Sequence, residues 1–187
     1  MVKEKFEALM GDVICALPQD VKAFLRIFED PDLEDEQRLW TAGALLHLLS
    51  GQNAIPGMRG VLAYVDDVIV LRLVLERLEA AAPEVMARHL AESPELLEPL
   101  GEDLAIVRDY LGELTAVLER ACDQLGQLTH QGRSARDCAT DPEAATWLYD
   151  AVQEALLDQL DFDEDDVIRE VRGVSRVKTS LQQRVGA

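Results

Sequence analysis

The chain has 187 residues, a length that allows one sizeable hydrophobic core or two smaller ones. Its 36 acidic and 18 basic side chains give a formal charge of −18, which would repel a phosphate backbone and argues against nucleic-acid binding. Hydrophobic residues make up 48% of the chain and aromatic residues only 5%. Since Leu and Ala dominate over the β-branched residues, we predict an all-α protein.

The cysteines and the uncharged segments indicate the compartment. Cys15, Cys122 and Cys138 are odd in number and show no CxxC spacing, and the chain lacks the basic start and apolar segment of a signal peptide. We therefore expect a cytoplasmic protein. The longest uncharged run, residues 39–58, is long enough to cross a bilayer, but polar residues and Pro56 in its second half indicate a loop.

Apolar residues recur at helical spacing through the first half of the chain. We predict one helix over residues 4–17 and a second that starts at Pro18 and ends before Pro31. The next helix, residues 36–49, is apolar nearly all round and should therefore be covered by its neighbours. In this helix Gly43 and His47 belong to a strip of small residues, continued by Ser50, where another backbone can approach.

A loop over residues 51–60 precedes a fourth helix, which begins near Val65 and ends in the alanines before Pro83. Three prolines, Pro83, Pro94 and Pro99, then interrupt the helical pattern in residues 80–101. We place a junction there, between a domain of residues 1–82 and a C-terminal helical bundle of residues 94–187. One continuous domain is the alternative.

The second half carries the most regular pattern in the chain. From Leu97 to Leu128 apolar residues alternate at spacings of three and four, which predicts one long helix. Because Tyr110 and Val117 widen its apolar stripe, we expect it to pack in a bundle. Residues 129–140 are predicted as a loop, and Asp141 followed by Pro142 as a helix start. The whole chain should form a bundle of about seven to eight helices.

The sequence of residues 50–67 is similar to a motif of a known protein family. Ser50, Ile55, Pro56, Asp66 and Asp67, followed by an apolar helix, match without a gap the general form Ser-Pro-x-Asp-Leu-Ile-Pro-Asp-x-Ile-Pro-x-x-Gly-x-x-Asp-Asp. This segment resembles the central motif of the YkvA-like bacterial domain of unknown function, and the likeness covers residues 35–80.

The chain also departs from this pattern. Where the family usually has Pro, Asp, Asp, Pro and Gly, it has Gly51, Asn53, Gly57, Gly60 and Ala63. The resemblance implies an all-helical domain that is cytoplasmic or peripheral to a membrane. It supplies no biochemical activity.

The adjacent acids Asp66 and Asp67 have no cationic residue three or four positions away on their helix. If they are buried, they must be neutralised or hydrogen-bonded, since an unpaired buried carboxylate costs several kcal/mol. The partners we expect are the free amides of residues 57–60, the Arg59 guanidinium and the first helical turn. In the structural interpretation, one Asp caps the helix or holds the loop containing Pro56 over the central helix.

In the functional interpretation, Asp66 and Asp67, together with Asn53 and His47, form a divalent-cation site or an acid/base pair. Adjacent residues on a helix point about 100° apart, so two such carboxylates seldom converge on one ion. We therefore assign no catalytic residue, metal ligand or cofactor. The acidic run that opens at Asp161 lacks the Gly and the final Glu of an EF-hand, and Cys122, His130 and Cys138 fit no zinc pattern.

Without a catalytic constellation, we predict a non-enzymatic helical protein that acts as an interaction or scaffold module, with a protein partner or a second copy of itself. Residues 154–166 hold seven acids and no base, whereas the basic residues after Glu170 have no acid among them. The alternative is a metal- or ligand-dependent enzyme that uses Asp66 and Asp67. Membrane contact follows from the resemblance alone, and the negative charge disfavours it on anionic lipid.

Overall fold

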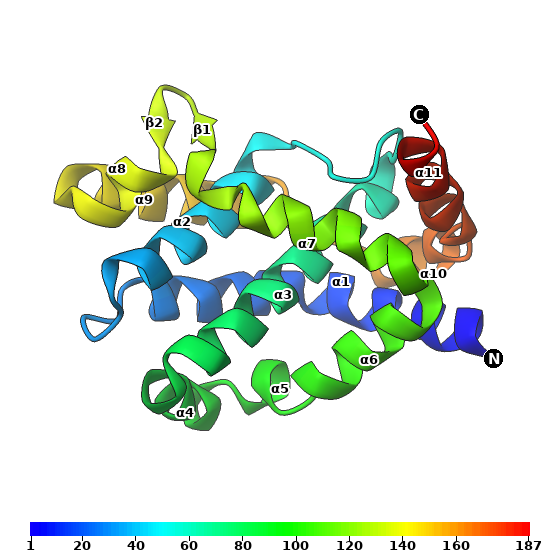
Figure 1. Cartoon of the computed structure of the whole chain (residues 1–187), viewed down its shortest axis with the longest axis horizontal. Helices are drawn as coiled ribbons and strands as arrows, with labels where there is room; N and C mark the ends of the chain where they lie inside the picture. Colours follow the sequence, from blue (N-terminus) through cyan, green and yellow to red (C-terminus); the bar gives the residue numbers. More distant parts are fainter.

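Three helices, α1 (Val2–Phe28), α2 (Asp35–Ser50) and α3 (Val65–Ala81), pack against one another at the centre of the protein. In this computed structural model, which describes all 187 residues, α3 crosses α1 (Figure 1). Every residue from 65 to 75 is buried, as is every residue from 41 to 48. The all-α prediction is confirmed, and α3 shares the covered central position that the sequence predicts for α2.

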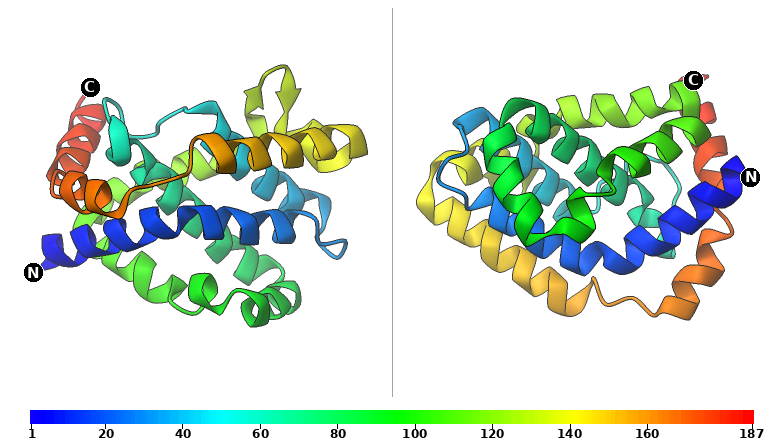
Figure 2. Two further views of the ribbon diagram at one scale, coloured as in Figure 1. Left: turned by 180° about the vertical axis from the view of Figure 1, so that it is seen from behind. Right: turned by 90° about the horizontal axis from the view of Figure 1, so that it is seen from below.

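The other elements surround these three helices (Figure 2). In chain order they are η1 (Gly60–Tyr64), α4 (Pro83–Glu92), α5 (Pro94–Leu97), α6 (Leu100–Leu111), η2 (Gly112–Leu114), α7 (Thr115–Asp123), η3 (Leu125–Gln127), β1 (Thr129–His130), β2 (Arg133–Ser134), α8 (Ala135–Thr140), α9 (Pro142–Asp158), α10 (Glu164–Val171) and α11 (Ser175–Val185). One hydrophobic cluster of 57 buried residues contains members from both predicted halves, because α1 packs against α6 and α10.

The prediction of two helices within residues 4–28 is wrong, because α1 is continuous and contains Pro18. Proline removes one backbone donor from a helix. The buried side chains continue on both sides of Pro18, from Phe6 through Ile14 to Phe24, and their burial compensates for the missing hydrogen bond.

The single long helix predicted over residues 97–128 is also wrong. Gly112 has φ +57° and ψ −131°, a conformation that suits glycine and ends α6. As a result α7 runs back across the molecule (Figure 1), so that α6 packs against α1 while α7 packs against α3. The three-and-four spacing marks the buried face of each piece but does not reveal the break between them.

The loop predicted over residues 129–140 is in fact a short hairpin, β1 and β2, followed by α8. Thr129 pairs with Ser134 in the hairpin. Ser134 then starts α8 through a capping box, in which its hydroxyl accepts from the Asp137 amide while the Asp137 carboxylate accepts from the Ser134 amide. The helix start at Asp141 is confirmed, since its side chain accepts from the Ala144 amide at 2.9 Å.

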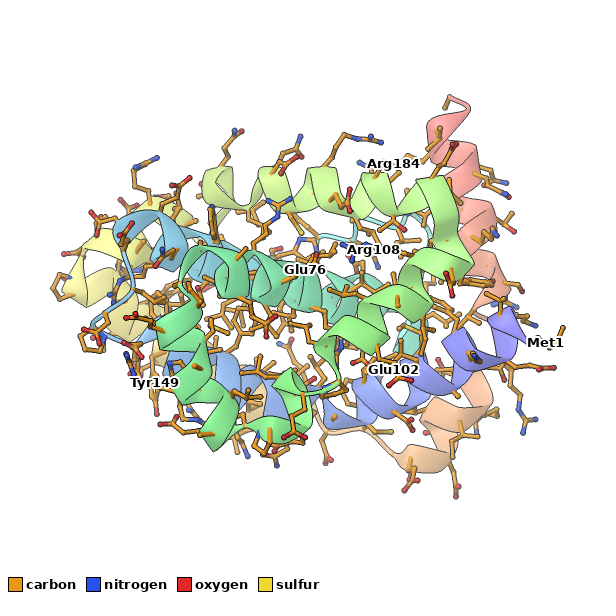
Figure 3. All side chains as sticks on the ribbon, turned by 60° about the horizontal axis from the view of Figure 1, so that its bottom comes forward. Met1, Glu76, Glu102, Arg108, Tyr149 and Arg184 are labelled. Carbon is orange, nitrogen blue, oxygen red and sulfur yellow. The ribbon has the colours of Figure 1, made fainter.

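A buried ion triad joins three helices of the core. The Arg72 guanidinium on α3 donates to Asp103 at 2.9 Å and to Asp20 at 3.3 Å. All three side chains are at most 10% exposed. Burial raises the pKa of Asp20 to about 6 although Arg72 opposes this shift. By contrast, the ion pair between Arg108 and Glu76, labelled in Figure 3, lies at the surface.

No helix of this structure combines the length and the apolar character that crossing a bilayer requires.

Candidate functional site

His47, Asp66 and Asp67 form a buried cluster where α2 meets the first turn of α3. The His47 Nε2 atom lies 3.0 Å from Asp66 Oδ2 and 3.7 Å from Asp67 Oδ1. The three side chains are 7%, 0% and 10% exposed, respectively. These are the only His, Cys, Asp or Glu residues of the chain whose side-chain atoms group closely enough to hold one metal ion.

The two carboxylates converge in spite of their adjacent positions on the helix. Neighbouring side chains on a helix diverge by about 100°, and this divergence argued against a shared site. Both carboxylates nevertheless place an oxygen near the same nitrogen, because His47 approaches them from α2. The sequence could not show this approach, since it depends on how α2 packs against α3.

Asp66 holds the loop between α2 and α3. Its Oδ2 atom accepts from the Ala54 backbone amide at 2.7 Å as well as contacting His47. Helix α3 has Tyr64 at its N-cap and no side-chain cap, so Asp66 does not cap the helix. The other oxygen, Asp66 Oδ1, is buried and has no hydrogen-bond partner.

Asp67 has even less compensation for its charge. His47 is the one basic group within 4.0 Å of its carboxylate. Burial, with the neighbouring charge of Asp66, raises the pKa of Asp67 well above its usual range. An acceptor-rich pocket with too few donors is the arrangement in which a cation or a proton is favoured.

The other residues singled out from the sequence lie in the loop and do not join the cluster. Asn53 donates to the Ala63 carbonyl and accepts from the Ile55 amide, so it shapes the loop. Pro56 is exposed, as is Arg59, which forms no ion pair with either aspartate. The expected partners, Arg59 and the amides of residues 57–60, are thus replaced by His47 and the Ala54 amide.

Three glycines give the loop its path. Gly51, Gly57 and Gly60 have φ of +63°, +77° and +60°. Proline, with φ fixed near −65°, cannot adopt these angles. The YkvA-like pattern has Pro at two of these positions, and a proline at either could not follow the path of this loop.

Residues from α10 and α11 hold the loop from outside. Ser180 donates to the Pro56 carbonyl and Arg184 donates to the Ala54 carbonyl. The Glu170 carboxylate accepts from the Val61 amide at 2.8 Å. Ala54 is therefore fixed on both sides, by Asp66 through its amide and by Arg184 through its carbonyl.

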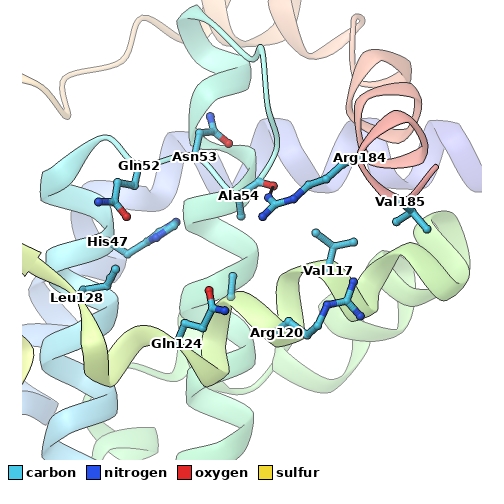
Figure 4. A pocket seen from close by; sticks show the side chains of 11 residues that line it. His47, Gln52, Asn53, Ala54, Val117, Arg120, Gln124, Leu128, Arg184 and Val185 are labelled. Carbon is cyan, nitrogen blue, oxygen red and sulfur yellow. Dashed lines mark hydrogen bonds between the residues drawn. The ribbon is translucent and has the colours of Figure 1, made fainter. Parts of the chain in front are cut away.

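A cavity of about 430 Å³ borders the cluster on the His47 side, and Figure 4 shows its lining. We call it the His47 cavity, and it is lined by His47, Gln52, Asn53, Ala54, Val117, Arg120, Ala121, Gln124, Leu128, Arg184 and Val185. It contains two arginines and no carboxylate.

A second cavity of about 660 Å³ borders the cluster on the Asp67 side. This Asp67 cavity contains five carboxylates and no basic residue, and the acids are Asp67, Asp161, Asp163, Asp166 and Glu170. Gln52 and Asn53 line both cavities. The cluster thus lies between an acidic cavity, which attracts cations, and a basic one, which attracts anions.

The cysteines take no part in the site. Cys122 and Cys138 are buried, and burial raises their pKa values to about 12 and about 11, so both are thiols at neutral pH. His130, which was considered with these two cysteines as a zinc ligand, lies instead near Trp147, and the two ring centroids are 6.4 Å apart.

No protein-family model, curated protein or solved structure matches the chain. The likeness to the YkvA-like domain over residues 35–80 therefore rests on the sequence pattern alone.

Sequence reasoning identified the three members of the cluster but missed the residues that enclose it. Arg184 is one of the basic residues noted after Glu170, but nothing in the sequence places it or Arg120 beside the cluster. Glu170 and Ser180 were missed for the same reason. One neighbouring contact was predicted, because the small residues around Gly43 indicated that another backbone approaches α2 there. The structure confirms this prediction, since a Cβ at Gly43 would meet the Leu125 carbonyl oxygen at 2.5 Å.

Proposed function

We propose that the protein binds one divalent transition-metal ion through His47, Asp66 and Asp67, and acts on a ligand that reaches this ion from the adjoining cavities. The observation that carries the proposal is Asp66 Oδ1, a fully buried carboxylate oxygen without a partner in a cluster of possible metal ligands. A buried acceptor of this kind costs free energy unless a cation or a proton compensates for it.

The composition of the cluster suits a metal ion. Two ionised carboxylates and a neutral imidazole carry a charge of −2, which one divalent cation neutralises. Ligand atoms bound at about 2.1 Å lie roughly 3–4 Å apart around an ion. The distances from His47 Nε2 to the two carboxylates, 3.0 and 3.7 Å, fall in this range. Imidazole is a ligand that suits Zn²⁺ and Fe²⁺, and carboxylate is one that suits Mn²⁺.

The Asp67 cavity gives a cation a route to the cluster. Asp67 is one of the five carboxylates that line it. Such a concentration of negative charge raises the local concentration of cations. A metal-dependent enzyme of this kind would work in a reducing cytoplasm, where Cys15, Cys122 and Cys138 would stay thiols.

Thermal melts of chelator-treated protein with Mn²⁺, Fe²⁺, Co²⁺, Ni²⁺ and Zn²⁺ test the metal site. We expect at least one ion to raise the melting temperature of the wild type by about 5–10 °C at a hundred times its Kd. Asp67→Asn should abolish this shift. In the absence of ions the same variant should be as stable as the wild type or more stable, because it removes one of two repelling buried carboxylates.

Asp165→Asn is the matched control, since Asp165 also belongs to an adjacent acid pair in the first turn of a helix but is exposed. It should keep the ion-dependent shift. If no ion changes the melting temperature and Asp67→Asn lowers it, then protons satisfy the cluster. The cluster would in that case be a structural connection between loop and helix, and the metal proposal would be wrong.

The interaction or scaffold function is a second candidate, favoured by one observation. No ion pair joins the acids of residues 154–166 to the basic residues after Glu170, and both Arg172 and Arg176 are exposed. These opposed charges are free to pair between copies. Light scattering at low and high salt should then detect a salt-sensitive dimer, whereas a monomer at every concentration would contradict self-association.

A further inference from the structure

The basic character of the His47 cavity is unusual for this protein. The whole chain has twice as many acids as bases, yet the cavity is lined by two arginines and no carboxylate. Figure 4 shows the side chains of Arg120 and Arg184 on the cavity wall, with His47 across from them. A guanidinium group without a carboxylate partner is available to an external anion.

Arg120 lacks a carboxylate partner because its acidic neighbours contact other arginines. Asp123, one helical turn away, accepts from Arg77 at 2.8 Å. The adjacent Glu119 lies 3.8 Å from Arg108. Arg120 itself forms no ion pair, and this exposed side chain lines the cavity.

Arg184 is held in place but only partly used. It donates through one nitrogen to the Ala54 carbonyl, whereas a guanidinium carries five N–H donors. Its remaining donors can take part in the two-pronged contact that carboxylates and phosphates accept. The contact with Ala54 also places Arg184 next to the residue whose amide binds Asp66.

Neutral donors and an apolar wall complete the cavity. The side-chain amides of Gln52 and Gln124 can donate to an anion. Val117, Leu128 and Val185 provide an apolar part of the lining. The volume, about 430 Å³, lies within the range of about 300–1,000 Å³ typical of small-molecule sites, so there is room for more than a bare anion.

From this arrangement we infer that the His47 cavity binds the oxyanion group of a small organic ligand, with Arg120 and Arg184 as its recognition residues. Phosphate and carboxylate share the chemistry that two guanidinium groups recognise. The role of the ligand as a substrate rests on the proposed metal site. Binding of the anion by the arginines does not.

The test titrates chelator-treated protein with inorganic phosphate, and in a second arm with succinate, by calorimetry. We expect millimolar or tighter binding of at least one probe, and its Kd should rise at least tenfold in Arg120→Gln and in Arg184→Gln. The arm with the lower Kd identifies the preferred oxyanion. Arg120→Gln is the cleaner variant, because Arg184→Gln also removes the contact with Ala54. Arg172→Gln should bind as the wild type does, because Arg172 is exposed like Arg120 and Arg184 but lies outside the cavity.

A second measurement separates this inference from the metal proposal. With Mn²⁺ added, the ³¹P signal of phosphate should broaden more in the presence of the wild type than in the presence of Asp67→Asn, since Mn²⁺ free in solution broadens it equally in both samples. If phosphate binding depends on the arginines but none of the five ions raises the melting temperature, the anion site holds and the metal proposal fails. If Mn²⁺ binds but neither probe does, or if the probes bind equally well to Arg120→Gln, the anion site is overturned and the metal proposal is left intact.

Discussion

Arg72→Met should lower the free energy of unfolding by about 3–5 kcal/mol at pH 8, because it leaves two buried carboxylates without a partner. Asp20 and Asp103 both bind the Arg72 guanidinium and have exposures of 5% and 10%. Methionine fills most of the space of the arginine stem, so the loss measures the missing charge more than a cavity. Urea denaturation monitored by circular dichroism gives the value.

The loss caused by Arg72→Met should be smaller at pH 5 than at pH 8. The pKa of Asp20 is already about 6 in the wild type, above its ordinary 3.8, so the folded state binds a proton more readily than the unfolded state. Stability from this group therefore falls as pH rises from about 4 through 6. Removing Arg72 should raise the pKa of Asp20 further, so that the stability of the variant continues to fall at a higher pH than that of the wild type.

Arg108→Met is the matched control for the triad. Arg108 binds Glu76 through two nitrogens, at 2.9 and 2.7 Å, but the two side chains are 41% and 44% exposed. An exposed pair contributes about 0–1 kcal/mol, so this variant should change stability little. Equal losses in Arg72→Met and Arg108→Met would show that burial of the triad does not set its contribution.

Gly43→Ala should be the most damaging single-methyl change in the central helices. The added Cβ would lie 2.5 Å from the Leu125 carbonyl oxygen and 2.7 Å from its carbonyl carbon. These are backbone atoms of η3, which cannot rotate away as a side chain can. We expect a loss of about 3 kcal/mol, at the upper end for overpacking, and a drop in melting temperature of about 6–12 °C.

Gly11→Ala provides the comparison for Gly43→Ala. Gly11 also lies inside a helix, α1, but a Cβ there would meet the nearest atom, on Val171, at an ordinary 3.8 Å. Alanine favours the helix over glycine by about 1 kcal/mol, so this variant should be slightly stabilised. If Gly43→Ala were equally harmless, the close approach of η3 to α2 would not be needed for the fold.

The fold class follows from composition and helical spacing, because both report which residues are buried. Breaks between helices are less predictable, since they depend on single residues in context. Pro18 does not end its helix, because the buried face continues past it, whereas Gly112 ends α6 in the middle of an unbroken apolar pattern. The start signal at Asp141 was correct, since its side chain accepts a hydrogen bond from the amide three residues ahead.

For the candidate site, the sequence identifies the unusual residues but not their partners. Asp66 and Asp67 stand out because they lack a cation within one helical turn, and His47 because it lies in a strip of small residues. That His47 contacts both aspartates depends on the packing of α2 against α3. Asn53 and Arg59 were candidates because they lie close to the aspartates along the chain. In the structure Asn53 forms hydrogen bonds within the loop and Arg59 is exposed.

The contacts that α10 and α11 make with the loop have a consequence for the order of folding. They join residues 109, 124 and 130 positions apart, and closing segments of this length is slow compared with forming helices. Helix α11 buries only Val177 and Leu181, so little apolar surface draws it to the core early. We therefore expect α1, α2 and α3 to pack while the loop is still open, and the cluster to gain its enclosing walls last.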